Sequence, residues 1–271
     1  MALKTEIIEP RIASKVLASK EDLLSGEYAS ELRELLEQRG VLVFPKVNFT
    51  DEEQVIFTET LGSLAQENAG ESIYKVTLDT EANALADYLK GSLYWHIDGT
   101  MNKVPILASI LSAKVLSKKG GQTEFCNTYA AYDDLQADEK KEYENLSVTH
   151  SAWNTLFYYD PEPSLAMLQQ MMSIGDNELP LVWTHRSGRK SLVLGCTAYQ
   201  VAGENRHDST KLLVKLREWA TQPKFVYRHQ WSIGDTVIWD NTGTMHRAIA
   251  YDPTSGRMLH RTKLEGEEAF A

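Results

Sequence analysis

The chain has 271 residues, of which 42% are hydrophobic and 24% charged, a composition that predicts one globular domain over 1–271 with a sizeable core. Its formal net charge of -10 argues against a nucleic-acid partner, because phosphate binding depends on clustered lysine and arginine. The N-terminus carries charge where a signal peptide needs an apolar run, and no apolar stretch of about 18 residues occurs, so we expect a cytoplasmic protein without a membrane span.

The first half of the chain is expected to mix helices with short strands. Residues 19–39 have the apolar spacing of one or two amphipathic helices, which Gly40 ends. Thr50 is typical of an N-cap and opens a second helical region that runs to about residue 61. Strands are expected at 41–44, 73–78, around His96, at 106–116 and from 123 to 127.

The second half predicts more strands than helices. Helices are expected at 132–143 and 210–221, and 165–172 is a loop or a short helix. Strands are expected at 148–157, in a hairpin around 186–189, and at 225–231, 236–239, 246–250 and 258–264. Many short strands with helices outside them indicate a mostly β fold with flanking helices, built on a double-stranded β-helix, or jelly-roll, core.

The segment from Tyr94 to Thr100 carries the clearest chemical signal. Alternate side chains of an extended segment point the same way, so His96 and Asp98 can reach one ion while Ile97 turns into the protein. His246, far downstream, would complete one face of an octahedron. Two histidines and one carboxylate with the opposite face open form the ligand set of non-heme Fe(II) oxygenases.

A His-x-Asp tripeptide alone is weak evidence, because a single histidine is more often a structural residue. The order of the other motifs strengthens it. The run 120–123 (GGQT) follows the pair by about one strand, 239–241 (WDN) leads into His246, and Arg257 lies eleven residues beyond His246.

With these motifs, and from residue 40 through residue 261, the chain resembles the taurine dioxygenase and 2,4-D dioxygenase family of Fe(II)- and 2-oxoglutarate-dependent enzymes. The resemblance implies that His96, Asp98 and His246 bind iron and form the catalytic centre. It also implies that Thr123 and Arg257 hold the far carboxylate of 2-oxoglutarate. Dioxygen is the second cosubstrate in the family, and the products are succinate, CO2 and an oxidised substrate.

The residue chemistry agrees with these implied roles. A guanidinium can bind both oxygens of a carboxylate, and a threonine hydroxyl adds a third hydrogen bond. Each member also has a structural interpretation: Arg257 as a surface charge after a turn, Thr123 as an ordinary strand residue, and residues 239–241 as packing and a turn. We favour the structural interpretation for residues 239–241, with Trp239 in the core and the next two residues shaping the loop that presents His246. The other histidines are expected to be structural or exposed.

The substrate is expected to be a small molecule, commonly an acid in this family, and Arg261 is the candidate to bind its anion. The segment 66–74 contains no histidine, although the taurine enzymes place a sulfonate-contacting one there, so taurine is disfavoured. Trp153 and Phe157 either line the pocket, which would favour an apolar or aromatic substrate, or belong to the core. Residues 70–91 form either a lid or an ordinary loop. The resemblance leaves a homodimer or a homotetramer open.

The same motifs are also compatible with three other functions. The same iron chemistry can serve desaturation or another tailoring step in natural-product synthesis. A jelly-roll protein that senses a metal or metabolite would need the metal ligands without the cosubstrate clamp. A zinc hydrolase would need a separate general base, and none stands at a recognisable spacing.

Overall fold

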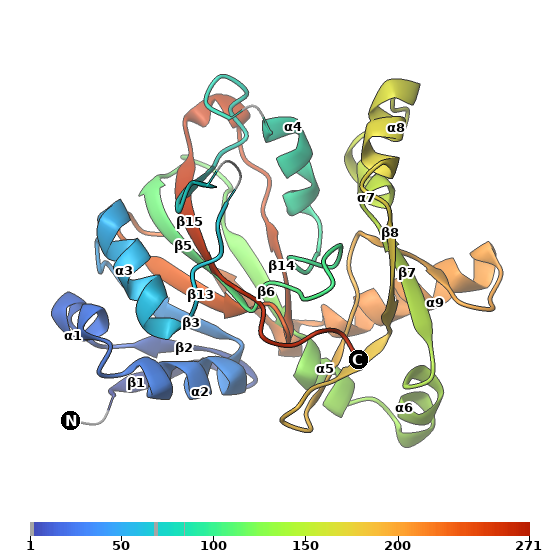
Figure 1. Cartoon of the computed structure of the whole chain (residues 1–271), viewed down its shortest axis with the longest axis horizontal. Helices are drawn as coiled ribbons and strands as arrows, with labels where there is room; N and C mark the ends of the chain where they lie inside the picture. The colour runs from blue at the N-terminus through green and yellow to red at the C-terminus, as the bar shows by residue number, and fades with distance from the viewer. Residues whose placement is uncertain (1–2, 68–69, 84) are drawn as a thin grey trace.

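The computed structural model describes residues 3–67, 70–83 and 85–271 (Figure 1). Within these residues the largest sheet has seven strands, antiparallel except for one parallel pair, β2 and β3. In spatial order the strands are β1 (Thr5–Glu9), β2 (Ile12–Val16), β3 (Val41–Phe44), β13 (Thr236–Asp240), β5 (Ala108–Val115), β15 (Met258–Leu264) and β4 (Tyr74–Val76).

Three helices cover one face of this sheet: α1 (Lys20–Ser25), α2 (Ala29–Arg39) and α3 (Asp51–Leu61) (Figure 1). The helix α2 ends where Gly40 adopts a φ of 71°, and α3 begins at a capping box formed by Thr50 and Glu53. The helix α3 holds the back of β15, since Thr58 and Thr262 share a hydrogen bond of 2.7 Å. Leucine and phenylalanine side chains from the helices and sheet form a continuous buried cluster between them.

A three-stranded sheet packs on the other face of the large sheet. Its order is β12 (Val226–His229), β6 (Thr123–Asn127) and β14 (Thr244–Ala248), with all pairs antiparallel. Phe125 of β6 packs against Trp239 of β13, with ring centroids 5.4 Å apart. The two sheets therefore face each other across a shared apolar layer.

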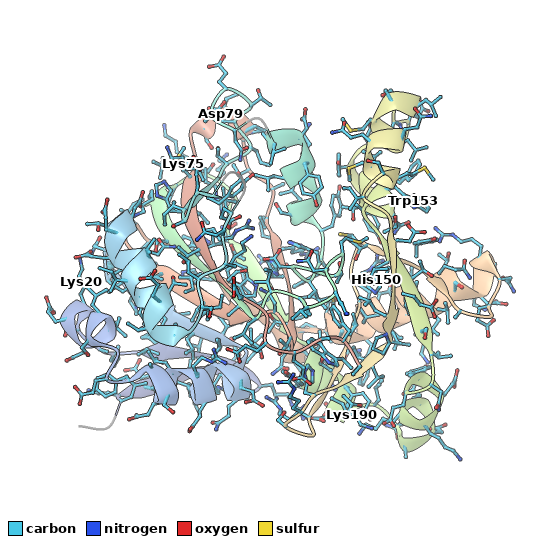
Figure 2. The ribbon with its side chains drawn as sticks, viewed as in Figure 1. Lys20, Lys75, Asp79, His150, Trp153 and Lys190 are labelled. Carbon is cyan, nitrogen blue, oxygen red and sulfur yellow. The ribbon has the colours of Figure 1, made fainter. Side chains whose placement is uncertain are left out.

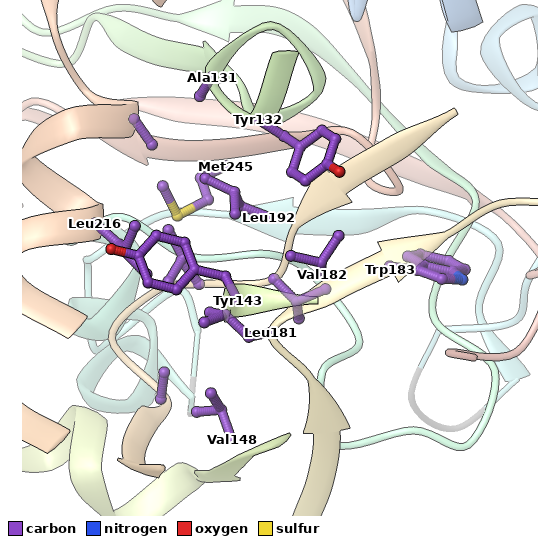
Figure 3. Close-up of a cluster of buried hydrophobic side chains, with 14 of the residues drawn as sticks. Ala131, Tyr132, Tyr143, Val148, Leu181, Val182, Trp183, Leu192, Leu216 and Met245 are labelled. Atoms are coloured by element: carbon purple, nitrogen blue, oxygen red, sulfur yellow. The ribbon is translucent and has the colours of Figure 1, made fainter. Parts of the chain in front are cut away.

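The remaining strands and some of the remaining helices build a further buried cluster beside the small sheet, shown in Figure 3. Tyr143, Val148, Trp183 and Leu216 bring helices and strands from distant parts of the chain into this cluster. The strands are β7 (Ser147–Ser151), β8 (Asp176–Pro180) and β11 (Ala198–Val201), and the hairpin of β9 (Val182–Thr184) with β10 (Lys190–Leu192). The helices that contribute are α5 (Thr128–Asp133), α6 (Ala137–Tyr143), α9 (Arg206–Ala220) and η3 (Pro223–Phe225). Outside this cluster lie α4 (Ala86–Leu89), η2 (Lys90–Leu93), α7 (Ala152–Tyr159), α8 (Leu165–Met172) and η4 (Pro253–Ser255).

Most expected elements occur, including the hairpin, but three expectations were wrong. The strand expected at 148–157 ends at Ser151 and continues as the helix α7, and the helix expected at 132–143 divides into α5 and α6. His96 lies in no extended strand and makes only an isolated bridge to His246. The 165–172 segment is a helix, α8.

The segment 70–91, expected to be a lid or a loop, contains β4, α4 and the start of η2, and the described residues between β4 and α4 have no helix or strand. Residue 84, also in that segment, lies outside the described residues. In the described part of the chain, no helix is both long and apolar enough to cross a membrane.

Candidate active site

The three expected metal ligands lie together between the two sheets. The backbone N–H of His96 donates to the carbonyl of His246 (3.1 Å), and the N–H of His246 donates back to the carbonyl of His96 (2.9 Å). Asp98 lies close to both rings: one carboxylate oxygen is 3.7 Å from Nε2 of His96 and the other is 3.8 Å from Nε2 of His246. Between the two ligands of the first segment, Ile97 is buried, as the alternation predicted.

The protonation of these groups suits a divalent ion. Nδ1 of His96 lies 2.8 Å from the carbonyl of Tyr94, which orients Nε2 towards Asp98. Burial, with His96 adding to it, lowers the pKa of His246 well below its usual value, so this imidazole is neutral and able to donate a lone pair. Although burial opposes ionisation of Asp98, His246, Arg261 and His96 outweigh it and hold its pKa well below the usual range. One ligand atom from each of the three residues lies within 4.8 Å of the others, so the donor set fits Fe(II).

A chain of buried hydrogen bonds fixes the carboxylate of Asp98. The Ser109 hydroxyl donates to Oδ2 of Asp98 (2.9 Å) and accepts from Nδ2 of Asn241 (3.0 Å), whose Oδ1 accepts from the indole of Trp239 (2.8 Å). Asn241 therefore supports Asp98 through Ser109 as well as shaping the loop before His246. The sequence motifs did not reveal Ser109, because its position depends on the pairing of Ser109 with Trp239 across β5 and β13.

Thr123 and Arg257 lie at another side of the same cavity, and both are buried. Arg257 donates from Nη2 to the carbonyl of Gly121 (2.8 Å), while its Nε has no hydrogen-bond partner among the described residues. The Thr123 oxygen accepts from the Trp231 indole (3.0 Å), which leaves the hydroxyl proton free to be donated. A buried guanidinium with an unused donor beside a free hydroxyl proton fits the far carboxylate of 2-oxoglutarate.

Gly121 makes room for this arginine. Its φ is +77°, and a Cβ added there would lie 2.6 Å from Nε of Arg257. The glycine of the 120–123 motif is therefore required both by its backbone conformation and by the close approach of Arg257.

Arg261 also lines the cavity, but it is not a free cation. Its Nε and Nη2 donate to the two oxygens of Glu67 at 3.1 and 3.2 Å, and Nζ of Lys263 lies 2.9 Å from one of the same oxygens. Burial opposes the charge of Arg261, and Asp98 and Glu67 outweigh it and raise its pKa above the usual value. Sequence reasoning missed Glu67 and Lys263, which come from segments almost 200 residues apart and carry no motif.

The cavity has a volume of about 460 Å³ and extends from the charged groups to an apolar wall. That wall includes Leu85, Tyr88 and Leu89 from the region of α4, and Met171 from α8. These residues line the same cavity as the cationic side chains of β15, so the cavity combines charged and apolar lining.

The structure places Trp153 and Phe157 outside the cavity lining. Trp153, labelled in Figure 2, packs against Tyr199 with ring centroids 4.8 Å apart, and Phe157 is 43% exposed. Because α7 is a helix rather than a strand, Ala152 and Thr155, three residues apart, share the face that lines the cavity. The aromatic pair lies on another face, so the proposed substrate contact of Trp153 and Phe157 is corrected to packing at the surface of α7.

Two of the other histidines, His150 and His185, make structural hydrogen bonds, in line with the expectation that these histidines are structural or exposed. His150 is fully buried in β7 (Figure 2) and bonds Thr197 through Nδ1 (2.8 Å), and Nε2 of His185 lies 2.8 Å from the hydroxyl of Ser191. Among the described residues, the only group of three or more histidine, cysteine, aspartate or glutamate side chains close enough to share a metal ion is the one around Asp98.

Comparison with known proteins gives consistent matches over nearly the whole chain. A family model described as "Taurine catabolism dioxygenase TauD, TfdA family" matches residues 5–263. The chain is 35% identical to the alpha-ketoglutarate-dependent 2,4-dichlorophenoxyacetate dioxygenase of Burkholderia sp. (strain RASC), over 98% of this chain and 95% of the relative. It is 33% identical to the (S)-phenoxypropionate/alpha-ketoglutarate-dioxygenase of Sphingobium herbicidovorans, over 85% and 83% of the two chains.

A solved structure shares the fold along the full length. The crystal structure of AAD-2 in complex with Mn(II) and N-oxalylglycine superposes with a TM-score of 0.86 at 31% identity, covering 100% of both chains. The mixed sheets and flanking helices described above therefore match an architecture found in a protein that binds a divalent metal.

Proposed function

The chain belongs to the TauD/TfdA family of Fe(II)- and 2-oxoglutarate-dependent dioxygenases, and from that membership we propose that it hydroxylates a small organic acid with an apolar or aromatic body. The reaction of the family uses Fe(II), 2-oxoglutarate and dioxygen, and oxidation of the substrate is coupled to decarboxylation of 2-oxoglutarate to succinate and CO2. Where the hydroxylated carbon carries an oxygen substituent, the product collapses and the ether or ester bond is cleaved.

His96, Asp98 and His246 would hold the iron, and Thr123 with Arg257 would hold the far carboxylate of 2-oxoglutarate. Together the bound metal and cosubstrate supply the oxidising power for an unactivated C–H bond. The chain supplies the positioning: Ser109 keeps Asp98 oriented through a 2.9 Å hydrogen bond. Ile97 and Trp95 are buried beside the ligands and keep the backbone of this segment in place.

One observation carries the substrate class: the cavity of about 460 Å³ is lined both by cationic side chains of β15 and by apolar residues from the region of α4 and from α8. An acid with an apolar body can place its anion near Arg261 and Lys263 and its carbon skeleton against Leu89 and Met171. This volume suits a drug-sized or smaller ligand. The named substrates of two relatives, 2,4-dichlorophenoxyacetate and phenoxypropionate, are acids of this kind.

We also propose that the seven-stranded and three-stranded sheets form the expected double-stranded β-helix core, and that residues 1–271 make one dioxygenase domain. The strands that carry the ligands and the clamp, β14, β6 and the β15 segment, all meet at the same cavity. Dividing the chain into two domains would place the metal ligands and the residues of the 2-oxoglutarate clamp in different units, which is why we propose a single domain.

The test is a substrate panel scored by succinate release above the background without substrate. The panel contains aryloxyacetates, alkyl sulfates, sulfonates and acylated amino acids, each matched with a neutral methyl ester or amide of the same body. We expect aryloxy acids to stimulate release and to give an oxidised product, and their neutral partners to fail. Equal stimulation by the neutral partners, or stimulation by taurine above all apolar acids, would contradict the proposal. A product with a new double bond would favour desaturation instead.

A further inference from the structure

The wall of the cavity beside the metal ligands carries a cluster of three charged side chains, Glu67, Arg261 and Lys263. The carboxylate of Glu67 is buried, with 4% of its side chain exposed. Arg261 binds both of its oxygens, at 3.1 and 3.2 Å, and Lys263 binds one of them at 2.9 Å. Two cationic side chains therefore converge on one buried carboxyl group.

The strand β15 determines that both cations face the cavity. Leu259, Arg261 and Lys263 alternate along the strand and all line the cavity, while Thr262 points to the other side and bonds Thr58 of α3. The Arg261 guanidinium also lies over the ring of Tyr74, 5.0 Å from its centroid. The pairing of β15 with β5 sets the register that points both side chains to this face of the strand.

The charges of the cavity are nearly balanced without this cluster. A divalent ion with Asp98 has a net charge of plus one, and a 2-oxoglutarate dianion with Arg257 has minus one. The cluster then decides the charge left for the substrate: two cations and one carboxylate leave a single positive charge.

We propose that Glu67 is a specificity-determining residue that reduces the anion-binding charge of Arg261 and Lys263 to one, so that the site accepts monoanionic substrates and rejects dianionic ones. The inference rests on the proposed function, because it concerns the anionic end of the same substrate. A carboxylate, a sulfonate or a sulfate monoester neutralises the site. A phosphonate or phosphate monoester would bring a second negative charge next to the buried Glu67.

The energy of such a charge is large enough to decide selectivity. A second negative charge held close to a buried carboxylate is repelled strongly, because the interaction of two charges grows as their distance and the surrounding dielectric constant fall. Solvent in the open cavity reduces this, so we expect about tenfold or greater discrimination against the dianion. Without Glu67 the two cations would favour the dianion instead.

The test measures binding rather than turnover, by calorimetric titration of the protein loaded with Mn(II) and N-oxalylglycine. The probes are 2,4-dichlorophenoxyacetate, (2,4-dichlorophenoxy)methylphosphonate and the monomethyl ester of that phosphonate. At about pH 8 the free phosphonate is a dianion, because its second ionisation is then complete, whereas its ester remains a monoanion of similar shape. Wild type is expected to bind the acetate and the ester, and to bind the dianion about tenfold or more weakly.

Four variants separate charge from shape. Glu67→Gln removes the negative charge and should reduce the gap between ester and dianion about tenfold or more, whereas Glu67→Asp should preserve the gap. Glu71→Gln removes the same charge from an exposed neighbour and should change nothing. Lys263→Met leaves no net positive charge and should weaken both monoanions about tenfold. Each variant must bind N-oxalylglycine as wild type does.

The outcomes distinguish this inference from the proposed function. If wild type binds the ester and the dianion equally, or if Glu67→Gln weakens all three probes alike, then Glu67 only orients Arg261 and the inference is wrong. The proposed function would survive that result, since succinate release measures it independently. If wild type binds N-oxalylglycine but none of the three probes, the inference is wrong, and succinate release with the substrate panel then decides the proposed function separately.

Discussion

Ser109 is the residue on which the orientation of Asp98 depends most directly. It is fully buried, and it joins the ligand carboxylate to the amide of Asn241. Ser109→Ala would leave the Asn241 amide without this acceptor and Asp98 free to rotate. We expect Fe(II) affinity to fall about tenfold or more, as for other residues that support metal ligands. The free energy of unfolding should fall by about 1–3 kcal/mol. Anaerobic Fe(II) titration and urea unfolding measure the two effects.

Ser112 provides the matched control for that variant. It lies on the same strand, is buried, and shares a hydrogen bond of 2.8 Å with Thr236 away from the metal ligands. Ser112→Ala should lower stability by a similar amount and leave Fe(II) affinity unchanged. If both variants lose metal affinity equally, Ser109 acts only through the stability of β5.

Gly121 is a position where an added side chain would disturb Arg257 of the cosubstrate clamp. In Gly121→Ala the new Cβ would start 2.6 Å from Nε of Arg257, so the guanidinium must move. We expect the KM for 2-oxoglutarate to rise about tenfold or more, because a displaced arginine loses its bidentate contact. Succinate release at varied 2-oxoglutarate concentration checks this.

The comparison for Gly121 is Gly188, which has a φ of +83° but nothing within 4 Å of an added Cβ. Gly188→Ala in the β9–β10 hairpin carries the same backbone strain, about 1–2 kcal/mol. Its KM for 2-oxoglutarate should equal that of wild type. A similar rise in both variants would point to general destabilisation rather than to the clamp.

At the scale of elements, α8 presents one apolar face to the cavity and another to solvent. Met171 is buried against Ala152 and Leu156 and lines the cavity, while Leu165 is 68% exposed. Met171→Ala should cost about 2 kcal/mol of stability, at the low end for such truncations because one side already faces the cavity. It should also raise the KM for an apolar acid several-fold, measured by succinate release. Leu165→Ala should do neither, and an equal effect of the two variants would place the substrate elsewhere.

The helix α7 shows where sequence patterns are insufficient. The run 151–159 is rich in aromatic residues, which favour strands, but the preceding strand ends at Ser151 and the chain turns into a helix. Helical spacing puts Ala152 and Thr155 on the face that lines the cavity and puts Trp153 and Phe157, four residues apart, together on another face.

The metal ligands could be predicted because short-range geometry brings His96 and Asp98 to one side whether or not a regular strand forms. Local signals also located Gly40 and Thr50, which end one helix and begin another. Ser109 and Glu67 could not be found in this way. Their positions depend on strand register and on a segment that folds back on β15, and one sequence contains neither piece of information.

At the scale of the whole molecule, buried histidines outside the metal site make stability depend on pH. Burial lowers the pKa of His150 to about 3 and, with Arg189, that of His185 to about 4. The unfolded chain binds these protons near pH 6.5, so between that value and the folded pKa it holds more protons than the native state. Stability is therefore complete above about pH 6.5 and falls on acidification, by up to about 1.4 kcal/mol per pH unit for each group.

Urea unfolding of metal-free protein between about pH 7 and pH 4.5 tests this dependence. His150→Gln should flatten the slope by about one proton relative to wild type. His207→Gln, at an exposed position in α9, should leave the slope unchanged. A slope that His150→Gln does not alter would mean that other groups carry the acid sensitivity.

Two main-chain hydrogen bonds join His96 to His246 across 150 positions of sequence, and the two imidazole rings pack beside them with centroids 4.1 Å apart. The main-chain hydrogen bonds that hold these two positions together therefore do not depend on which side chains bind the ion. Evolution can exchange the donor atoms at these positions, and an experimenter can strip and replace the ion, while the backbone that holds them side by side remains. A fold arranged in this way can acquire new oxidative reactions by point substitution, without passing through a disordered intermediate.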